Sequence, residues 1–143
     1  MPPTPPKPNL DHPVFAAVKA KFPGARFRAT EFRGLSTLVV EPGDLLRVMR
    51  FLKDDPGCDF NFLSDVTAVD YLNYPAPMPG RFGVIYVLRS HARDDLFVVK
   101  AYLDPSLPTE GIDEDPALYL ESVTGIWPGA EWTEREVFDM YGI

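Results

Sequence analysis

One cysteine, two histidines and no long apolar run set the first limits on what this 143-residue sequence can do. Cys58 alone cannot form an internal disulfide or supply the four thiolates of an iron–sulfur cluster. A lone thiol of this kind suits a small apolar position near a turn in a protein from a reducing compartment. His12 and His91 fall near the expected ends of secondary-structure elements, so the sequence does not favour a metal site that they share.

Clustered basic charge and targeting signals are also lacking. The formal net charge is -7, and no tract of five or more lysines and arginines occurs. Nucleic acid is therefore excluded as an expected partner, because phosphate binding needs clustered cations. No stretch reaches the ~18 apolar residues of a membrane span, and the N-terminus lacks the apolar run of a signal peptide. We expect a cytoplasmic protein that meets membranes only through partners.

The common catalytic and cofactor motifs are missing too. The sequence has no GxGxxG fingerprint, no P-loop and no HExxH motif. Neither histidine has a neighbouring serine or cysteine in an arrangement that suggests a triad. We therefore predict no catalytic, cofactor-binding or metal-binding residue on this chain.

What the sequence does contain indicates one folded domain. Hydrophobic residues make up 45% and aromatic residues 13% of the chain, which is typical of a globular protein of one domain. Residues 1–10 are rich in proline and predict a flexible tail with polyproline geometry. Residues 11–143 are expected to form the single domain.

Apolar periodicity predicts the element order αββαβββαα. The expected elements are a helix at 11–22, strands at 26–33 and 35–41, a helix at 42–54, strands at 60–72, 81–90 and 95–103, and helices at 118–127 and 133–141. Because helices and strands do not alternate strictly, the pattern favours an α+β fold with a mixed or antiparallel sheet and helices on one face. Residues 81–90 are apolar on both sides, which indicates a central strand covered on both faces.

Two aspartates interrupt the strand expected at 60–72. Asp65 and Asp70 are five residues apart, so they point to opposite faces of a strand and cannot form a close catalytic pair. Asp65 lies beside Ser64 and Thr67, where it can bond neighbouring backbone at a bulge or sheet edge. A contact between Asp65 and a partner protein remains the alternative.

Residues 132–142 are the densest in charged and aromatic side chains. Thr133 and Glu136 have the spacing of a capping box, and Gly142 suits a C-terminal helix stop. Arg135 and Asp139 lie four residues apart and can pair. A helix this short is unstable alone, so it packs on its own domain, on another subunit, or on both.

The segment Glu134–Gly142 resembles the E-R-E-x-x-D-[FM]-[FY]-G signature of the 30-kDa subunit of respiratory complex I, which is the C subunit of bacterial NADH:quinone oxidoreductase. Residues 122–132 resemble the part of the family that precedes this signature, and Leu63–Tyr71 resembles an earlier strand motif. The resemblance covers roughly residues 42–143 in the correct order and spacing.

The resemblance implies a peripheral-arm subunit with an α+β fold and no redox centre of its own. It would dock to the 49-kDa quinone-site subunit on the cytoplasmic side of the inner membrane, within a translocase that uses NADH, FMN, iron–sulfur clusters and quinone. By match to the signature, charged residues would make charge-assisted bonds to a partner or across the subunit, and aromatic residues would anchor an interface. The charged set is Glu134, Arg135, Glu136 and Asp139; the aromatic set is Trp127, Trp132, Phe138 and Tyr141.

Two other interpretations stay open from the sequence. Related subunits occur in membrane-bound hydrogenases and in dehydrogenases with other electron donors, and a free-standing binding module would also lack catalytic residues. Family members usually continue past the signature glycine with a basic, proline-containing tail, whereas this chain ends at Ile143. We therefore expect either a truncated sequence or a member without the tail.

Overall fold

The structure is a computed structural model that describes residues 12–32, 35–73, 75, 78–92, 94–104, 120–141 and 143, with only the backbone for residues 32 and 139–141. The expected proline-rich tail lies outside these residues. The elements in chain order are α1 (Pro13–Lys21), β1 (Phe27–Phe32), β2 (Leu35–Val40), the short 3-10 helix η1 (Pro42–Asp44), α2 (Leu45–Asp54), β3 (Phe62–Asp70), β4 (Phe82–Ser90), β5 (Asp95–Leu103) and α3 (Ala130–Tyr141).

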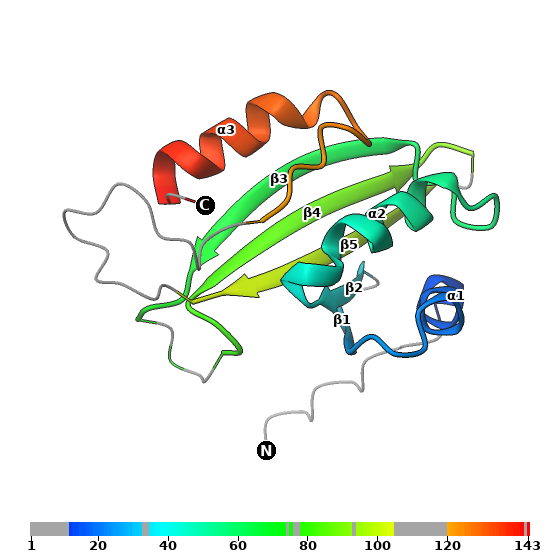
Figure 1. Ribbon diagram of the computed structural model, residues 1–143, viewed down its shortest axis with the longest axis horizontal. Coiled ribbons are helices and arrows are strands. Elements are labelled where there is room, and N and C mark those ends of the chain that lie inside the picture. The colour runs from blue at the N-terminus through cyan, green and yellow to red at the C-terminus, as the bar shows by residue number, and fades with distance from the viewer. Residues whose placement is uncertain are drawn as a thin grey trace, which may run out of the picture.

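The five strands form one mixed sheet in the order β1-β2-β5-β4-β3 (Figure 1). Two antiparallel hairpins, β1–β2 and β4–β5, meet where β2 runs parallel to β5. β3 pairs antiparallel with β4 and forms one edge of the sheet. The α+β class and the mixed sheet predicted from the sequence are confirmed.

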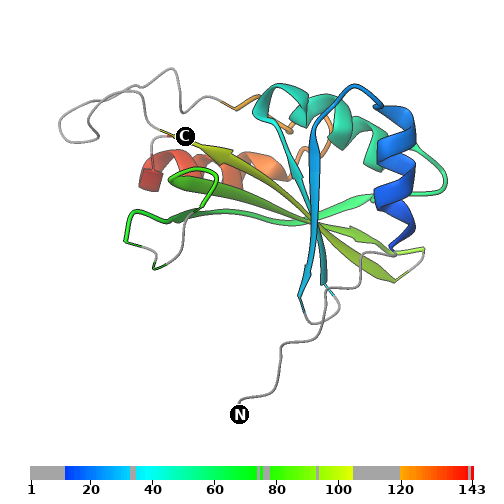
Figure 2. The same cartoon turned by 90° about the horizontal axis from the view of Figure 1, so that it is seen from below.

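One face of the sheet carries the core. The register places Leu38, Val99, Tyr86 and Val66 in one row across β2, β5, β4 and β3, and all four side chains are buried. Because alternate residues of a strand share a face, the buried alternation continues along β4 and β5. Figure 2 shows α2 and α3 on the same side of this sheet, as expected for helices on one face.

The helix α2 supplies the largest apolar stripe against the core face. Its residues Leu45, Val48, Met49 and Leu52 are all fully buried, as their i, i+3, i+4 and i+7 spacing predicts. Cys58 follows in the turn after α2, and its side chain is buried in the core.

The prediction that β4 is covered on both faces is wrong within the described residues. Ile85 and Val87 point away from the helices and are only half-buried, and no described helix covers them. A run of apolar residues on both sides of a strand therefore did not indicate a second layer of helices here. It reflects an open sheet face that is itself apolar.

The helix predicted at 118–127 is also not found in its described part. Residues 120–127 contain a turn at 124–126 and no helix, whereas the earlier residues of that prediction lie outside the described set. Val123, Ile126 and Trp127 are buried at helix-like spacing because the backbone N–H of Trp127 bonds to the carbonyl of Val123, which closes a single turn. Pro128 and Gly129 then separate this turn from α3.

Candidate subunit-docking site

The helix α3 begins at Ala130, one turn earlier than the sequence pattern indicated. Thr133 is therefore inside the helix, where its hydroxyl donates a 3.0 Å hydrogen bond to the carbonyl of Ala130. The predicted capping box is wrong, because a threonine inside the first turn bonds backward to a carbonyl instead of capping N–H groups ahead of it. Glu131, not Glu136, is the acidic residue of the first turn.

The inner side of α3 is fixed to the segment that precedes it by Glu134. One carboxylate oxygen of Glu134 accepts a 2.7 Å hydrogen bond from the backbone N–H of Val123, and the other accepts a 2.7 Å bond from the Ser122 hydroxyl. The N–H of Val123 belongs to a buried residue, so the carboxylate satisfies a donor that water does not reach. Glu134 therefore acts across its own subunit, which is one of the two roles that the resemblance implied.

Behind Glu134, the helix covers a small cavity on the core face of the sheet. This cavity has a volume of about 80 Å³, and its lining includes Val84, Tyr86 and Val137. Burial, together with the negative charge of Glu134, raises the pKa of the Tyr86 phenol well above its ordinary value. Binding sites for cofactors and drug-sized ligands enclose ~300–1,000 Å³, so this cavity is too small for a quinone or nucleotide.

The outer side of α3 exposes large side chains. Trp132 is 77% exposed and Phe138 is 54% exposed, which makes Trp132 the most exposed large apolar side chain of the described residues. Arg135 and Glu136 lie between them and are exposed as well. A tryptophan and a phenylalanine beside an arginine are the residue types that dominate protein interfaces.

The remaining signature residues have other positions. Trp127 is buried in the chain's own core, where its indole N–H donates a 3.2 Å hydrogen bond to the carbonyl of Phe60. Asp139 and Tyr141 lie in α3, but their side chains are outside the described set, as is Gly142. The predicted pair between Arg135 and Asp139 therefore stays a prediction.

The Glu134 contacts were not predicted from the sequence. Ser122 precedes Glu134 by 12 residues, and no helix or strand period connects residues at that separation. The sequence signal that could have suggested the contact is the turn-forming pair Pro128-Gly129, which allows the chain to fold back on α3.

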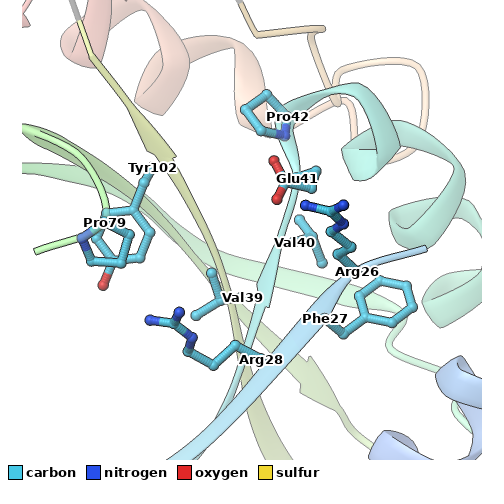
Figure 3. A pocket seen from close by; sticks show the side chains of 9 residues that line it. All are labelled: Arg26, Phe27, Arg28, Val39, Val40, Glu41, Pro42, Pro79 and Tyr102. Atoms are coloured by element: carbon cyan, nitrogen blue, oxygen red, sulfur yellow. The ribbon is translucent and has the colours of Figure 1, made fainter.

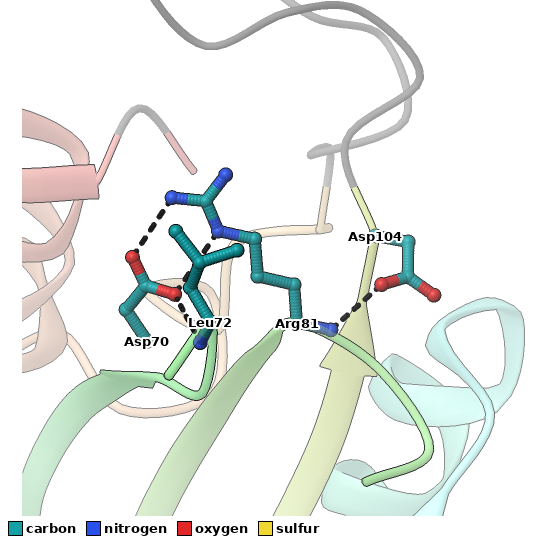
Figure 4. Close-up of polar contacts among 4 residues, drawn as sticks. All are labelled: Asp70, Leu72, Arg81 and Asp104. Atoms are coloured by element: carbon teal, nitrogen blue, oxygen red, sulfur yellow. Dashed lines mark hydrogen bonds and ion pairs between the residues drawn. The ribbon is translucent and has the colours of Figure 1, made fainter. Parts of the chain in front are cut away.

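Asp70 has a structural partner at the far end of β3 (Figure 4). The Arg81 guanidinium donates bonds of 3.0 and 2.9 Å to its two carboxylate oxygens, and the N–H of Leu72 donates another of 3.0 Å. The hydrogen bonds from Arg81 lower the pKa of Asp70, against a smaller opposing effect of burial. Asp104, just after β5, accepts a 2.7 Å bond from the Arg81 N–H, so Arg81 links the end of β3 to the end of β5.

Asp65 lies on the opposite face of β3, as predicted, because it pairs in register with Val87 while Asp70 pairs with Phe82. The register shifts between Leu63 and Asp65, so a bulge, one of the two settings predicted for Asp65, is present. The predicted bond from Asp65 to neighbouring backbone is not found among the described residues. Asp65 is exposed, and no described residue bonds its carboxylate.

The two histidines occupy structural positions. His12 caps α1 by accepting the N–H of Val14 at Nδ1, and its Nε2 lies 2.7 Å from the carboxylate of Asp95. His91 receives a hydrogen bond from the Asn61 side chain to its Nδ1 at 3.3 Å. Among the described residues, no group of three histidine, cysteine or carboxylate side chains has metal-binding geometry.

Comparison with known proteins decides the family. A family model described as the 30 Kd subunit of respiratory-chain NADH dehydrogenase matches residues 38–143. The chain belongs to this family. The match runs from β2 to the end of α3 and so includes both Glu134 and the outer side of α3.

Similar proteins carry a consistent name. The C subunit of NADH-quinone oxidoreductase from Roseiflexus sp. (strain RS-1) is 38% identical, with 91% of this chain and 67% of that protein covered. The protein of the same name from Citrifermentans bemidjiense is also 38% identical, over 88% of this chain and 68% of its own length. The one from Xanthobacter autotrophicus is 36% identical over 90% of this chain, which spans 54% of that longer protein.

Two solved structures share the fold. A trypsin-resistant fragment of Nqo5 is 30% identical and superposes with a TM-score of 0.70, covering 92% of this chain and 91% of the fragment. A chain of the membrane-bound sulfane sulfur reductase, an archaeal respiratory membrane complex, has a TM-score of 0.65 at 22% identity, over 92% of this chain and 67% of its own. The second likeness concerns the fold alone.

Proposed function

We propose that this chain is a non-catalytic peripheral-arm subunit of a proton-translocating NADH:quinone oxidoreductase, and that it docks to the 49-kDa quinone-site subunit through the outer side of α3. Its contribution to electron transfer from NADH to quinone is to hold that subunit in place. Family membership supports the enzyme, because the similar proteins are named as the C subunit of NADH-quinone oxidoreductase. The other subunits of the peripheral arm are its remaining partners.

The observation that carries the docking proposal is the exposure of Trp132 and Phe138 on a helix that is otherwise fixed. Glu134 fixes the inner side of α3 to residues 122–123, and Val137 is buried in the core, so the outer side is presented on a rigid support. Burying a tryptophan and a phenylalanine removes some 150–250 Å² of surface each from water. Arg135 and Glu136 between them supply charge-assisted hydrogen bonds that set the orientation of the partner.

In this proposal the redox groups belong to other subunits. FMN, the iron–sulfur clusters, NADH and quinone are then bound elsewhere in the complex. For the clusters this agrees with the sequence, because four thiolates hold such a cluster and this chain has one cysteine, which is buried. Among the described residues, no helix is long and apolar enough to cross a membrane. We place the chain peripherally on the cytoplasmic side of the inner membrane, held there by its partners.

The test is a double variant, Trp132→Ala with Phe138→Ala, expressed in place of the wild-type chain. Loss of two exposed aromatic anchors, each worth at least ~2 kcal/mol at an interface centre, should reduce the amount of assembled complex and its NADH:quinone activity at least tenfold. The isolated double variant should unfold at the same urea concentration as wild type, because both side chains are exposed.

The matched control is Leu72→Ala, which truncates an apolar side chain that is 63% exposed in the turn after β3. It should leave assembly unchanged. Normal assembly and activity of the aromatic double variant would reject α3 as the docking element.

A further inference from the structure

The sheet face opposite the helices is apolar and lacks a described cover. Val39, Ile85 and Val87 are half-buried on this face, and Val98 is 5% exposed. They are neighbours across β2, β5 and β4, since Thr37 pairs with Val98, Val98 with Val87, and Val39 with Lys100. Contiguous apolar side chains that no described helix covers offer a floor on which a partner can pack.

Two adjoining grooves cross this face, with volumes of about 480 and 330 Å³. They share Arg28, Val39, Pro79 and Tyr102. Figure 3 shows Val39 between Arg28 on one side and Tyr102 with Pro79 on the other. We call the two together the β-face groove.

The charges in the β-face groove have mostly one sign. Of the described residues, Arg28 and Lys100 are the charged ones that line the larger part, and the smaller part adds Arg26 and Glu41. No described residue forms a hydrogen bond or ion pair with the guanidinium of Arg26 or Arg28. The groove therefore contains three cationic side chains and one carboxylate, although the net charge of the whole chain is -7.

Lys100 is held in place more firmly than a surface lysine. Its ammonium lies 4.8 Å from the ring centroid of Tyr71 and 4.7 Å from that of Tyr102, and it donates a 2.5 Å hydrogen bond to the Tyr71 hydroxyl. Two tyrosine rings attract the cation through their faces and restrict the rotation of its stem. Less side-chain entropy is then lost when an acceptor binds the ammonium.

Gly83 makes this arrangement possible. A Cβ at position 83 would lie 2.9 Å from the Cε of Lys100 and 2.9 Å from a ring carbon of Tyr71. Those distances are shorter than real contacts of a Cβ atom, so any side chain at this position displaces the lysine or the ring. The missing side chain at the second position of β4 is thus explained by the packing of Lys100 on the open face.

We propose that the β-face groove binds an acidic segment of a partner subunit, one that places carboxylates on Arg28 and Lys100 and apolar side chains on the valine floor. The proposal rests on the proposed function in so far as the partner is another subunit of the same complex. The groove lies on the sheet face opposite α3. It would therefore be a second contact surface for partners, separate from the docking helix. Arginine, tyrosine and methionine, here Arg28, Tyr102 and Met78, are the types enriched in interface cores.

A second copy of this chain is a poorer occupant. Two identical chains related by a two-fold axis place the same patch against itself, which would bring Arg28 and Lys100 against their own copies. An anionic bilayer is also a poorer occupant, because a broad surface would meet Glu41 and Asp65 on the same face and the charge of -7 of the whole chain. A narrow acidic segment meets only the groove.

The test is photo-crosslinking within the assembled complex. The amino acid p-benzoylphenylalanine replaces Thr37, which lines the larger part of the groove, in one strain, and replaces Trp132 on α3 in another. The probe at position 37 should link to a partner-subunit peptide that contains at least two carboxylates. Adding Arg28→Glu and Lys100→Met should reduce this link about tenfold or more, whereas Lys19→Glu, an exposed charge change on α1, should leave it unchanged.

The two positions separate this proposal from the proposed function. A link from position 132 without one from position 37 overturns the groove proposal alone, and the reverse result overturns docking through α3 alone. A link from position 37 to lipid, to a second copy of this chain or to a segment without carboxylates also overturns the groove proposal. So does a link that survives Arg28→Glu with Lys100→Met.

Discussion

The carboxylate of Glu134 accepts a 2.7 Å hydrogen bond from the backbone N–H of Val123 and so joins α3 to the turn that precedes it. The contact separates the two sides of α3. The inner side is committed to the subunit's own core through Glu134 and Val137, and the outer side presents Trp132 and Phe138 to solvent. Neighbouring residues of this segment therefore have different roles: those on the inner side stabilise the fold, and those on the outer side are available to a partner.

Removal of the Glu134 carboxylate should destabilise the chain. Glu134→Ala leaves the buried N–H of Val123 without an acceptor, which costs ~1–3 kcal/mol. Glu134→Gln retains an acceptor oxygen and should cost less. Urea unfolding of the isolated variants measures both, with Glu136→Ala as a control that stays within ~0.5 kcal/mol of wild type because its side chain is exposed. Equal stability of Glu134→Ala and Glu136→Ala would show that the contact does not matter.

The pair between Asp70 and Arg81 should give a pH-dependent contribution to stability. Because the folded state lowers the pKa of Asp70, its contribution is present above the unfolded pKa of ~3.9 and is lost as the pH falls toward the lower folded value. Both side chains are partly exposed, so Asp70→Asn should cost only ~1 kcal/mol or less at pH 7. The difference between wild type and Asp70→Asn in urea unfolding should shrink between pH 5 and pH 3. A difference that grows in this range would contradict the lowered pKa.

Replacement of Gly83 in β4 should lower the stability of the fold more than replacement of Gly43 in η1. Gly83→Ala forces Lys100 or Tyr71 aside and should cost ~1–3 kcal/mol, as overpacking does. Gly43→Ala meets no atom within 4 Å and should change stability by less than ~0.5 kcal/mol. Thermal unfolding of the two variants gives the comparison, and equal melting temperatures would mean that the lysine is not held as described.

The neutral ring of His12 should occupy a single tautomer. Its Nδ1 accepts the N–H of Val14, so the proton of the neutral ring resides on Nε2 and is donated to Asp95. Nitrogen chemical shifts of the ring measure this directly in the isolated chain. Asp95→Asn should leave the Nδ1 contact intact, and a shift pattern typical of the Nδ1–H form in wild type would contradict the assignment.

The parts of the fold that could be predicted from sequence are those set by local periodicity. The stripe Leu45, Val48, Met49 and Leu52 specifies α2 because each position is fixed by the helical repeat, and the same holds for the alternating strands. Trp127 shows the limit, since its spacing from Val123 is the same in one closed turn as in a full helix. The contact of Glu134 with residues 122–123 was not predictable because it depends on how the chain folds back after Pro128-Gly129.

The open face shows a second limit of the same kind. Apolar residues on both sides of β4 predicted burial on both sides, which follows from the composition of the strand alone. The composition of β4 does not say what covers its second side. That depends on side chains from other strands, such as Arg28 of β1 and Lys100 of β5, which lie on the same face. Their convergence beside Val39 becomes visible only when β2 is known to pair with β5.

The central claim, that this chain is a docking subunit without its own redox centre, is tested most directly by purifying the tagged chain from its complex in mild detergent. Mass spectrometry of the co-purifying proteins should identify the 49-kDa quinone-site subunit as the chief partner, and the chain released from the complex should show no visible absorption and oxidise no NADH. A released chain that carries flavin or an iron–sulfur spectrum, or a tagged chain that purifies without the quinone-site subunit, would contradict the account.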